Sequence, residues 1–529
     1  MRIDTFRFGE LSYFSKLLSD YTSHHLPAHL QLPYALSLEG IGQQLKEPYP
    51  LKIDRTILSE TILKQYQYID VPAAVRTNIE FLKQSRTYTV VTAHQLSMLG
   101  GPLYFVIKIA NTIAFARKLR AEFPDAYFVP VYWMGSEDHD FEEVNHIHLF
   151  GKKIVWETEQ TGPVGRFSLE NIKDVVSQVA NILGENNPDN IQELIRKAYT
   201  HETTELASRE LVNGLFGRYG LVIVDGDDTV LKGAVADIIQ EEILKQPSYV
   251  LLSERSEELK SAGYHAQATG RAINLFYLGD AFRKRISPVE GGYEIGDEIY
   301  TEELLLEEIR QRPENFSPNV VLRPVFQQSV LPNVGFIGGG GEIAYWMQLT
   351  SVFQHYDARF PVLIPRTSLM LVNHANYLKL QKLHLEISDI FKDKEVLKKE
   401  YLVKSGDEIP SLDEEKQAVA RLMDKVKEKA SEIDKTLGPS AGADAQKIQA
   451  ILEQIEGKML RAVKQRNDTG LKQIDSLYQT FFPDNSLQER HDNFLTFYSR
   501  YGKNFIDWLV GYLSVIEQEF VVITETEKL

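Results

Sequence analysis

Short apolar runs alternate with helix-length segments along the first part of the chain. Residues 88–92, 127–134 and 221–224 are runs of aromatic, β-branched and other apolar residues without a regular polar alternation. Such runs are typical of strands buried on both faces of a parallel sheet. Residues 103–120, between the first two runs, have the apolar periodicity of a helix. The repeated order of strand and helix predicts a doubly wound α/β sheet, in which ligands bind outside the carboxyl ends of the strands.

The pattern changes between about residues 374 and 468, where Pro and Gly become rare and Lys and Glu more frequent. Apolar residues recur there with coiled-coil spacing, at Leu412, Val419, Val426 and Ile433 in a first run and at Ile448, Leu452, Ile455, Met459 and Ala462 in a second. Residues 438–442, Gly-Pro-Ser-Ala-Gly, separate the two runs. This predicts an antiparallel helical hairpin with arms of about 35 Å, at about 1.5 Å per residue. We expect the hairpin to serve packing or dimerisation.

A chain of 529 residues is too long for one core of ordinary size. The hydrophobic pattern divides it into an α/β core with inserted elements over residues 1–373, the helical hairpin over 374–468, and a C-terminal helical segment over 469–529. Aromatic residues are frequent between 478 and 513. We interpret them as core residues that return the chain to the first domain.

Composition and charge narrow the classes of function. A formal net charge of −16, with no segment that concentrates Lys and Arg, argues against a nucleic-acid binder and favours small polar substrates. No stretch approaches the roughly 18 apolar residues of a membrane helix, and the N-terminus lacks the apolar core of a signal peptide. We therefore expect a cytoplasmic protein without a membrane partner. The chain contains no cysteine, which excludes disulfides, thiolate metal sites and an enzyme-bound thioester.

Acids and imidazoles follow the predicted strand 127–134 at once: Glu137, Asp138, His139 and Asp140, with His146 close behind. Three interpretations compete. Asp138, Asp140 and His146 are of metal-ligand types, but consecutive strand-end residues point to opposite sides and no HExxH motif is present. A carboxylate beside an imidazole can instead orient that imidazole, which suits binding of an amine and removal of its proton. The third interpretation is a polar loop without chemistry, which four successive ionisable groups make less favourable.

A turn at residues 94–104 is a second candidate, and it contains His94, Gln95, Gly100, Gly101 and Tyr104. It lies between a predicted strand and a predicted helix, where backbone N–H groups and the helix dipole favour an anion. It has neither the P-loop spacing nor a G-x-G-x-x-G fingerprint. An ordinary tight turn is the alternative.

A run of four glycines, Gly338, Gly339, Gly340 and Gly341, precedes Glu342 and Tyr345. Four glycines in a row are costly in backbone entropy, which favours a loop that wraps a ligand or takes several positive φ values. Upstream, Arg323 ends a predicted strand and suits a carboxylate or a phosphate. A glycine-rich hinge is the alternative.

These motifs resemble the cysteine-adding enzymes of bacillithiol biosynthesis, a family of cysteine ligases. The resemblance rests on Thr92-x-x-Gln95 with Gly-Gly-Pro-Leu-Tyr at 100–104, on EDHDFEEVNH at 137–146, on YHAQ at 264–267 with NLFY at 274–277, and on residues 317–323 with 338–346. It extends over essentially the whole chain. The sequence departs from the family at Ala93-His94, where Gly-Gln is usual, and at Gly340, where Pro is common.

The resemblance implies a Rossmann-like core with inserted connecting elements, a coiled-coil hairpin and a homodimer. It also implies that the carboxyl of L-cysteine is joined to the amine of glucosaminyl-malate, the last step of bacillithiol synthesis. ATP is the expected donor, so ATP or ADP is expected to bind, with Mg²⁺ accompanying the nucleotide and no structural metal. The HxGH and KMSKS signatures of class I adenylation are absent.

The candidate residues fit that reaction. Glu137, Asp138 and Asp140 are expected to hold the amine, with His139 or His146 as the base. His94, Gln95 and the helix after Gly101 are expected to face phosphate or malate, and Arg323 a carboxylate. The set expected to bind substrate or nucleotide is His94, Gln95, Gly100, Gly101, Tyr104, Arg323, Gly338, Gly339, Gly340, Gly341, Glu342 and Tyr345. Two other functions stay open: a non-catalytic sugar-binding or scaffold dimer, and a metal-dependent hydrolase using Asp138, Asp140 and His146.

Overall fold

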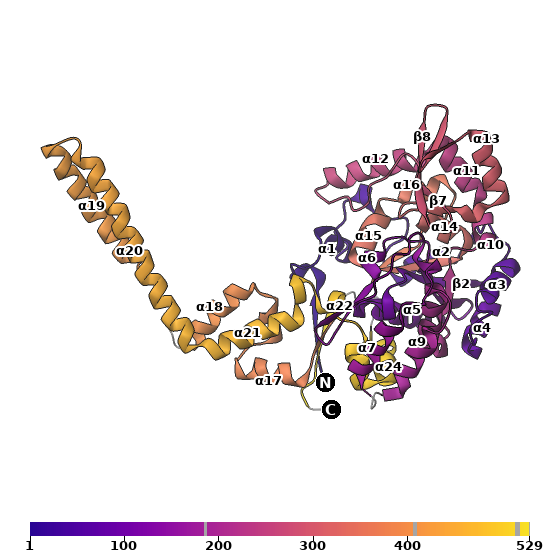
Figure 1. Ribbon diagram of the computed structural model, residues 1–529. Coiled ribbons are helices and arrows are strands. Elements are labelled where there is room, and N and C mark those ends of the chain that lie inside the picture. The colour runs from indigo at the N-terminus through magenta and orange to yellow at the C-terminus, as the bar shows by residue number, and fades with distance from the viewer. Residues whose placement is uncertain (185–187, 406–409, 514–518, 528–529) are drawn as a thin grey trace. The chain divides into compact units, whose positions relative to one another are not determined.

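A computed structural model describes residues 1–184, 188–405, 410–513 and 519–527. The chain forms two compact units, whose elements are labelled in Figure 1. The larger unit comprises Thr5–Met370 and Gln488–Val521, and the smaller unit comprises Met1–Asp4, Leu371–Leu487 and Val522–Leu529. No helix within the described ranges is long and apolar enough to cross a membrane.

The centre of the larger unit is a parallel sheet with the strand order β13–β12–β2–β3–β6. Its strands are β2 (Thr87–Gln95), β3 (Tyr127–Gly135), β6 (Val222–Asp225), β12 (Asn333–Gly338) and β13 (Val362–Pro365). Nearly all of their residues are buried, which explains the apolar runs in the sequence. The strand order reverses between β2 and β12, so the predicted doubly wound sheet is confirmed. Ligands of such sheets bind at the carboxyl ends of the strands beside the reversal.

Strands β2 and β3 bring two of the polar candidate segments together. Their parallel register pairs Thr87 with Tyr127 at one end and Gln95 with Gly135 at the other. The loops that follow both strands therefore begin side by side. Helix α5 (Leu103–Glu122), the helix predicted from apolar periodicity, connects β2 to β3 and packs against both of them.

Further helices surround this sheet or extend from it within the larger unit. They are α1 (Lys16–Thr22), α2 (Leu38–Gln44), α3 (Arg55–Lys64), α4 (Ala73–Phe81), α6 (Phe141–Val144), α7 (Lys173–Leu183), α8 (Ile191–Ala198), α9 (Thr204–Phe216), α10 (Thr229–Gly233), α11 (Ala236–Lys245), α12 (Pro247–Ser261), α13 (Glu302–Gln311), α14 (Arg323–Val330), α15 (Gly340–Met347), α16 (Thr350–His355), α22 (Gln488–His491), α23 (Leu495–Tyr501) and α24 (Lys503–Tyr512).

A second, antiparallel sheet is inserted between β6 and β12 of the central sheet. Its strand order is β10–β9–β8–β7–β11. The strands are β7 (Leu275–Leu278), β8 (Arg283–Val289), β9 (Gly292–Ile295), β10 (Glu298–Tyr300) and β11 (Phe316–Pro318). Two smaller sheets pair β4 (His146–Leu149) with β5 (Lys152–Val155), and order β1 (Arg2–Arg7), β15 (Glu519–Thr524) and β14 (Ser368–Val372) as β1–β15–β14.

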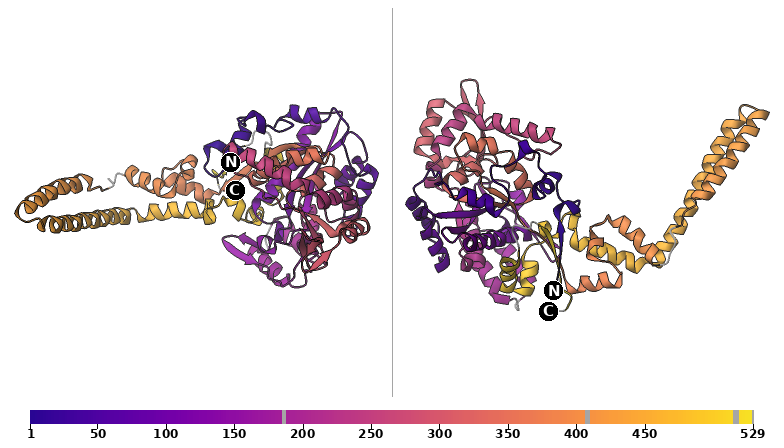
Figure 2. Two further views of the ribbon diagram at one scale, coloured as in Figure 1. Left: turned by 90° about the horizontal axis from the view of Figure 1, so that it is seen from above. Right: turned by 180° about the vertical axis from the view of Figure 1, so that it is seen from behind.

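The smaller unit contains the predicted helical hairpin. Its arms are α19 (Asp413–Ile433) and α20 (Leu437–Arg466), which lie side by side in both views of Figure 2. The other helices of this unit are α17 (His374–Lys382), α18 (Lys394–Lys404) and α21 (Asp468–Phe481). The predicted break at 438–442 is wrong, because α20 already begins at Leu437 and the turn lies at residues 434–436. Pro439 is tolerated because the first-turn N–H groups of a helix have no intrahelical acceptor.

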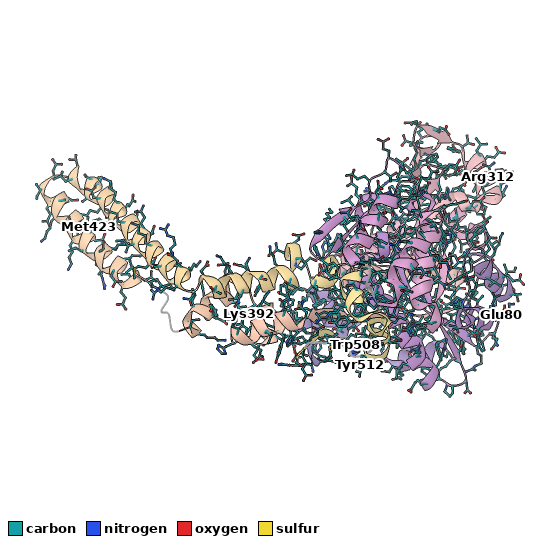
Figure 3. The ribbon with its side chains drawn as sticks, turned by 60° about the horizontal axis from the view of Figure 1, so that its bottom comes forward. Glu80, Arg312, Lys392, Met423, Trp508 and Tyr512 are labelled. Atoms are coloured by element: carbon teal, nitrogen blue, oxygen red, sulfur yellow. The ribbon has the colours of Figure 1, made fainter. Side chains whose placement is uncertain are left out.

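The aromatic residues of the C-terminal segment are only partly core residues. Phe494, Tyr498 and Phe505 are buried in the larger unit, where α24 packs against α5. Tyr512, which we expected in the core, is 69% exposed and stacks on Trp508, with ring centroids 5.6 Å apart (Figure 3). The two residues are four positions apart on α24, so they share a helix face that is turned toward solvent at Tyr512.

Candidate active site

A cavity of about 1140 Å³ opens at the carboxyl ends of β2 and β3 in the larger unit. Its charged and polar lining comes from the central sheet, from α5, α6, α10, α14 and α15, and from the inserted sheet and its flanking loops. These residues are His94, Gln95, Tyr104, Lys108, Glu137, Asp138, Glu143, Lys232, Thr269, Arg271, Arg283, Arg285, Ser287, Asn319, Arg323, Glu342 and Tyr345. The apolar lining includes Trp133, Leu231, Phe276 and Phe326.

The cavity brings together eight of the residues that the sequence singled out: His94, Gln95, Tyr104, Glu137, Asp138, Arg323, Glu342 and Tyr345. The other candidates are not among its lining residues: His139, Asp140, His146, Gly100, Gly101, Gly338, Gly339, Gly340 and Gly341. Six further charged lining residues are not among those predicted from the sequence: Lys108, Glu143, Lys232, Arg271, Arg283 and Arg285. Apart from Glu143, which lies inside the acidic motif itself, none of these stood out by local sequence.

Asp138 and Glu143 are held together by an amide from the neighbouring strand. Gln95 Nε2 donates to Asp138 Oδ2 at 2.6 Å and to Glu143 Oε2 at 3.1 Å. Asp138 Oδ1 accepts the backbone N–H of His139 at 2.8 Å and lies 3.5 Å from Arg283 Nη1. Burial alone would raise the pKa of Asp138, but hydrogen bonds from His139 and Gln95 and the charge of Arg283 hold it well below the usual range. Asp138 is therefore an anion throughout the physiological pH range.

His139 lies beside Asp138 at the edge of the cavity. Its Nδ1 is 3.6 Å from Asp138 Oδ1 and 3.2 Å from Arg283 Nη1. Its ring contacts Phe276, with centroids 5.7 Å apart. Both Arg283 and Phe276 line the cavity, so His139 adjoins it without being enclosed by it.

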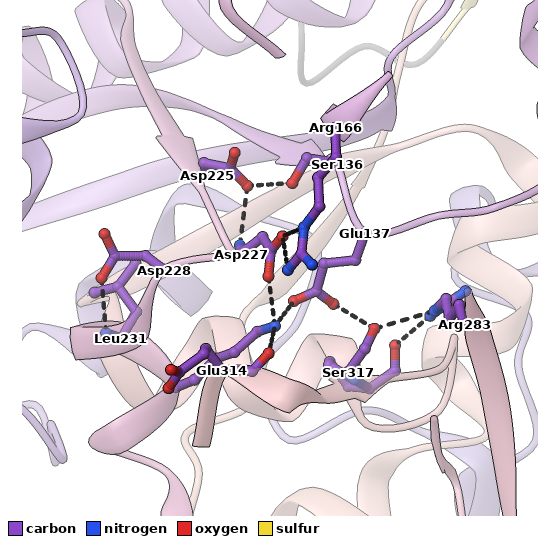
Figure 4. Close-up of polar contacts among 12 residues, drawn as sticks. Ser136, Glu137, Arg166, Asp225, Asp227, Asp228, Leu231, Arg283, Glu314 and Ser317 are labelled. Atoms are coloured by element: carbon purple, nitrogen blue, oxygen red, sulfur yellow. Dashed lines mark hydrogen bonds and ion pairs between the residues drawn. The ribbon is translucent and has the colours of Figure 1, made fainter. Parts of the chain in front are cut away.

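Glu137 belongs to a buried ionic network that joins the ends of β3, β6 and β11 (Figure 4). Lys232 Nζ lies 2.7 Å from both Glu137 Oε1 and Asp227 Oδ1. Ser317 Oγ donates to Glu137 Oε2 at 2.6 Å and accepts from Arg283 Nε at 3.1 Å. Burial opposes the charge of Lys232, but Glu137 and Asp227 raise its pKa above the ordinary value. The network fixes Glu137 and Arg283 relative to one another.

The carboxyl of Asp225, at the end of β6, has a raised pKa, unlike that of Asp138. Ser136 Oγ donates a very short hydrogen bond to Asp225 Oδ1, and the N–H of Asp227 donates to the same oxygen at 2.9 Å (Figure 4). Burial, together with the nearby negative charges of Glu205 and Asp227, raises the pKa of Asp225 to about 7. Asp225 itself does not line the cavity, but Gly226 beside it does.

Lys108 is a buried cation in the middle of α5, with a side chain only 2% exposed. Its Nζ donates to Ala93 O at 2.5 Å and to Glu342 Oε2 at 2.7 Å. Burial lowers the pKa of Lys108, although Glu342 acts in the opposite direction. The same Glu342 oxygen accepts the N–H of Gly339 at 2.9 Å, so Lys108 ties β2 to the first turn of α15.

His94 is fixed as a neutral imidazole at the end of β2. Its Nδ1 accepts the backbone N–H of Gln95 at 2.8 Å, which places the ring proton on Nε2. Within the described part of the chain, this buried Nε2 has no hydrogen-bond partner. Burial, reinforced by the charges of Lys108 and Arg366, lowers the pKa of His94 well below its ordinary value. His94 therefore presents a donor rather than a proton acceptor.

The glycine run is a strand-to-helix junction, with Gly338 at the end of β12 and Gly339 as the N-cap of α15. The expectation of positive φ values is wrong, because none of the four glycines has one. Tight packing accounts for part of the run: a Cβ on Gly338 would lie 3.0 Å from Glu342 Cβ, and one on Gly340 would lie 3.1 Å from Leu18 Cδ2. Glu342 and Tyr345, rather than the glycines, face the cavity.

The other predicted glycine turn is tied to the C-terminal segment of the larger unit. Gly100 and Gly101 have φ values of 75° and 60°. Asn493 Nδ2 donates to Leu99 O at 3.1 Å and to Gly101 O at 2.6 Å. The leading amide of α5, Leu103 N–H, donates to Asp492 O at 2.8 Å. At least one backbone amide that could bind an anion at this turn is therefore already hydrogen-bonded within the protein.

Arg323 begins a helix, and the expectation that it ends a strand is wrong. Strand β11 stops at Pro318, and Asn319 Oδ1 accepts the N–H groups of Val321 and Leu322, which starts the turn into α14. Arg323 is the first residue of α14. Its Nη1 donates to Gln327 Oε1 and its Nη2 to Tyr345 Oη, each at 3.0 Å.

The ligand set of the metal alternative does not converge. His146 is the first residue of β4, where its Nδ1 lies 3.1 Å from Asn145 Oδ1. Asp140 is exposed at the start of α6. Within the described residues, Asp138, Asp140 and His146 do not form a group whose ligand atoms lie within reach of one ion.

Fold and site together define a Rossmann-like α/β protein with a polar small-molecule cavity at the carboxyl edge of its sheet and a coiled-coil hairpin as a second unit. Residues 1–367 match the family model described as "Bacillithiol biosynthesis BshC, N-terminal Rossmann-like domain". Residues 369–525 match the model described as "Bacillithiol biosynthesis BshC, C-terminal coiled-coil domain". The chain belongs to the BshC family of bacillithiol biosynthesis, which confirms the resemblance found in the sequence.

Curated relatives match along nearly their whole length. A Flavobacterium johnsoniae protein is 36% identical over 99% of this chain and 100% of the relative. A Flavobacterium psychrophilum protein is 35% identical, with 99% of each chain covered. A Christiangramia forsetii protein is 35% identical, with 98% of each covered. All three carry the name "Putative cysteine ligase BshC".

Proposed function

We propose that the chain joins the carboxyl of L-cysteine to the amine of glucosaminyl-malate, forming an amide. The observation that carries this proposal is the contact of Gln95 with both Asp138 and Glu143 at the adjoining ends of β2 and β3. It places two carboxylates on the wall of a cavity whose volume, about 1140 Å³, accommodates two small substrates. The names of the relatives support a cysteine ligase.

Asp138 holds the acceptor amine as an ammonium and is not its base. A carboxylate whose pKa is held well below the usual range binds a cation but accepts a proton poorly near neutral pH. His139 takes up the proton. It adjoins Asp138, whereas His94 has its Nδ1 occupied and His146 lies outside the cavity. Arg283 Nη1 lies 3.2 Å from Nδ1 of His139 and can only donate a hydrogen bond, so Nδ1 is the unprotonated nitrogen of the neutral ring and the atom that accepts the proton.

Other donors that line the cavity suit the carboxyl that is to be joined. Arg323 and Tyr345 contact each other and both line the cavity, and His94 offers its Nε2–H. A guanidinium and neutral donors of this kind bind a carboxylate and stabilise the negative charge that develops on its oxygen during attack by the amine.

ATP is the proposed donor, because a free carboxylate must be activated before an amine can displace its oxygen. When bound with Mg²⁺, ATP would supply that activation. The leading amides of the two helices considered for phosphate are engaged, Leu103 N–H by Asp492 O and Gly339 N–H by the Glu342 carboxylate. Binding of the phosphate chain would therefore depend on cationic side chains of the cavity.

Reconstitution with purified protein tests the proposal. Glucosaminyl-malate, L-cysteine and MgATP are combined, and the amide product and the nucleotide products are quantified together by mass spectrometry. We expect the amide and the nucleotide product to appear in equal amounts. Turnover that does not depend on cysteine, or nucleotide cleavage without amide, would contradict the proposal. If the chain were a scaffold, replacing Asp138 and His139 would leave thiol levels in cells unchanged.

A further inference from the structure

Six cationic side chains line the cavity, and three of them have no carboxylate partner among the residues that the structure describes. Lys108 pairs with Glu342, Lys232 with Glu137, and Arg283 with Asp138. The remaining three are Arg271, Arg285 and Arg323.

The excess of positive charge is unusual for this chain. The cavity wall carries four carboxylates, Glu137, Asp138, Glu143 and Glu342, against the six cations. The whole chain, by contrast, has a formal net charge of −16. Arg271 and Arg285 are exposed to solvent in this lining, and like charges collected on one wall attract an anion through their summed field. The lining therefore indicates an anionic ligand group beyond the single carboxylate that Arg323 and Tyr345 would take.

Arg285 is held in place without a carboxylate. It lies on β8 directly opposite Phe276 of β7, and its guanidinium carbon is 5.7 Å from the Phe276 ring centroid. The guanidinium carbon of Arg283 lies 4.1 Å from the centroid of the same ring. Both arginines lie on one face of β8, because successive side chains of a strand alternate in direction. Stacking on Phe276 restrains Arg285 while leaving its N–H donors available.

Arg271 and Arg323 are anchored by one pair of asparagines. Asn274 Oδ1 accepts the N–H of Arg271 at 3.0 Å and an N–H of Asn319 Nδ2 at 2.8 Å. The backbone N–H of Arg323 donates to Asn319 O at 2.9 Å. Both asparagines contact each other, so the two loops that carry these arginines are fixed relative to one another on the cavity wall.

We propose that Arg271 and Arg285 form a subsite for a dianionic group, and that this group is the pair of malate carboxylates of the acceptor. The choice of malate rests on the function proposed above. Two residues of a strand span about 7 Å, so Arg285 lies about that far along β8 from Arg283, which contacts Asp138. The subsite is thus a short distance from the carboxylate that holds the amine. One compact acceptor with an ammonium and two carboxylates can therefore contact Asp138 and the subsite at the same time.

Steady-state kinetics with two acceptors tests the subsite. Arg285→Gln and Arg271→Gln are compared on glucosaminyl-malate and on a methyl glucosaminide without carboxylates. Lys284→Gln is the matched control, since Lys284 lies on the same strand but the opposite face, over Phe282. We expect KM for glucosaminyl-malate to rise at least tenfold in each arginine variant, with no change for the methyl glucosaminide or in the control. Equal losses on both acceptors, or a loss in Lys284→Gln, would overturn the subsite.

Calorimetry with L-malate and with inorganic triphosphate separates the two sources of anion and does not depend on turnover. We expect Arg285→Gln to lose most of its affinity for L-malate and to retain its affinity for triphosphate. The reverse pattern would overturn the malate assignment in favour of a phosphate chain. Arginine-dependent malate binding by a protein that forms no amide would leave the subsite standing and remove the proposed ligase reaction.

Discussion

In the reaction proposed above, Asp138 is the residue on which the chemistry of the cavity depends most. It receives hydrogen bonds from Gln95 and from the His139 backbone and faces Arg283. Asp138→Asn keeps the shape of the side chain but removes its charge and replaces one acceptor oxygen by an NH2 donor. We expect turnover to fall at least about tenfold, or about 1.4 kcal/mol of transition-state stabilisation, in a protein that still folds. Amide formation measured in the reconstituted assay checks this.

The control for that variant is Asp125→Asn, an equal change at an exposed residue before the amino end of β3. It should behave as the wild type. An Asp138→Asn protein as active as this control would return the acidic motif to the interpretation of a polar loop without chemistry.

The buried imidazole of His94 makes the free energy of unfolding depend on pH. Its folded pKa is depressed, so below about pH 6.5 the unfolded chain takes up a proton that the folded chain does not. Its contribution is therefore fully present above that pH and is lost as the pH falls. We expect the wild type to lose up to about 1.4 kcal/mol per pH unit relative to His94→Gln between pH 6.5 and 5.5. Urea unfolding of both proteins over that range measures the difference, and parallel pH profiles would contradict the buried neutral imidazole.

At the scale of elements, Asn274 secures the segments that carry the cavity arginines. Its side chain is fully buried, donates to Ser248 Oγ at 2.7 Å and accepts from Arg271 N–H and Asn319 Nδ2. Asn274→Ala would leave buried donors unpaired, at a cost on the order of 2–4 kcal/mol. We expect that loss in urea unfolding together with a higher KM for the acceptor. Asn315→Ala, which removes bonds to Glu308 and Tyr277 instead, should cost stability without changing KM.

The central sheet could be predicted from the sequence because its signal is local. Strands buried on both faces require apolar residues at nearly every position, and β2, β3 and β6 appear where such runs occur. The carboxyl-edge location of Gln95 and Asp138 follows from the same reasoning, since polar residues directly after such strands lie at the ligand edge of the sheet.

Most of the cationic wall could not be predicted, because the contacts that place Lys108 and Arg283 join residues far apart in the sequence. Lys108 occupies an ordinary helix position, and its partner Glu342 is 234 residues away. Arg283 and Asp138 are 145 residues apart. The turn of the hairpin was misplaced for a different reason: Gly438 and Pro439 usually break helices, but the first turn of α20 accepts both.

At the scale of the whole molecule, the hairpin exposes apolar residues that its own two arms do not cover. Leu422 is 60% exposed and Ile433 is 82% exposed, and Val426, Leu437, Ile451, Ile455 and Met459 are exposed as well. Two helices alone rarely bury a coiled-coil seam completely, and a second copy of the chain would cover these residues. This supports the homodimer that the resemblance implies, which we retain as a proposal.

Deleting the hairpin so that residue 410 joins residue 468 should give a monomer in sedimentation equilibrium. The paired change Leu422→Asp with Val426→Asp, which share a helix face, should weaken the dimer without removing the helices. Lys425→Asp, exposed on the same helix, is the control and should stay dimeric. A deletion variant that still forms dimers would show that the hairpin is not the main interface.

The central claim is that one cavity, at the carboxyl ends of β2 and β3, binds the acceptor and holds its amine at Asp138. A crystal structure of the protein with glucosaminyl-malate tests it most directly. The account predicts density inside the cavity, with the amine within hydrogen-bonding distance of Asp138 and the malate carboxylates toward Arg271 and Arg285. Acceptor density outside the cavity, or bound with its amine directed away from Asp138, would contradict it.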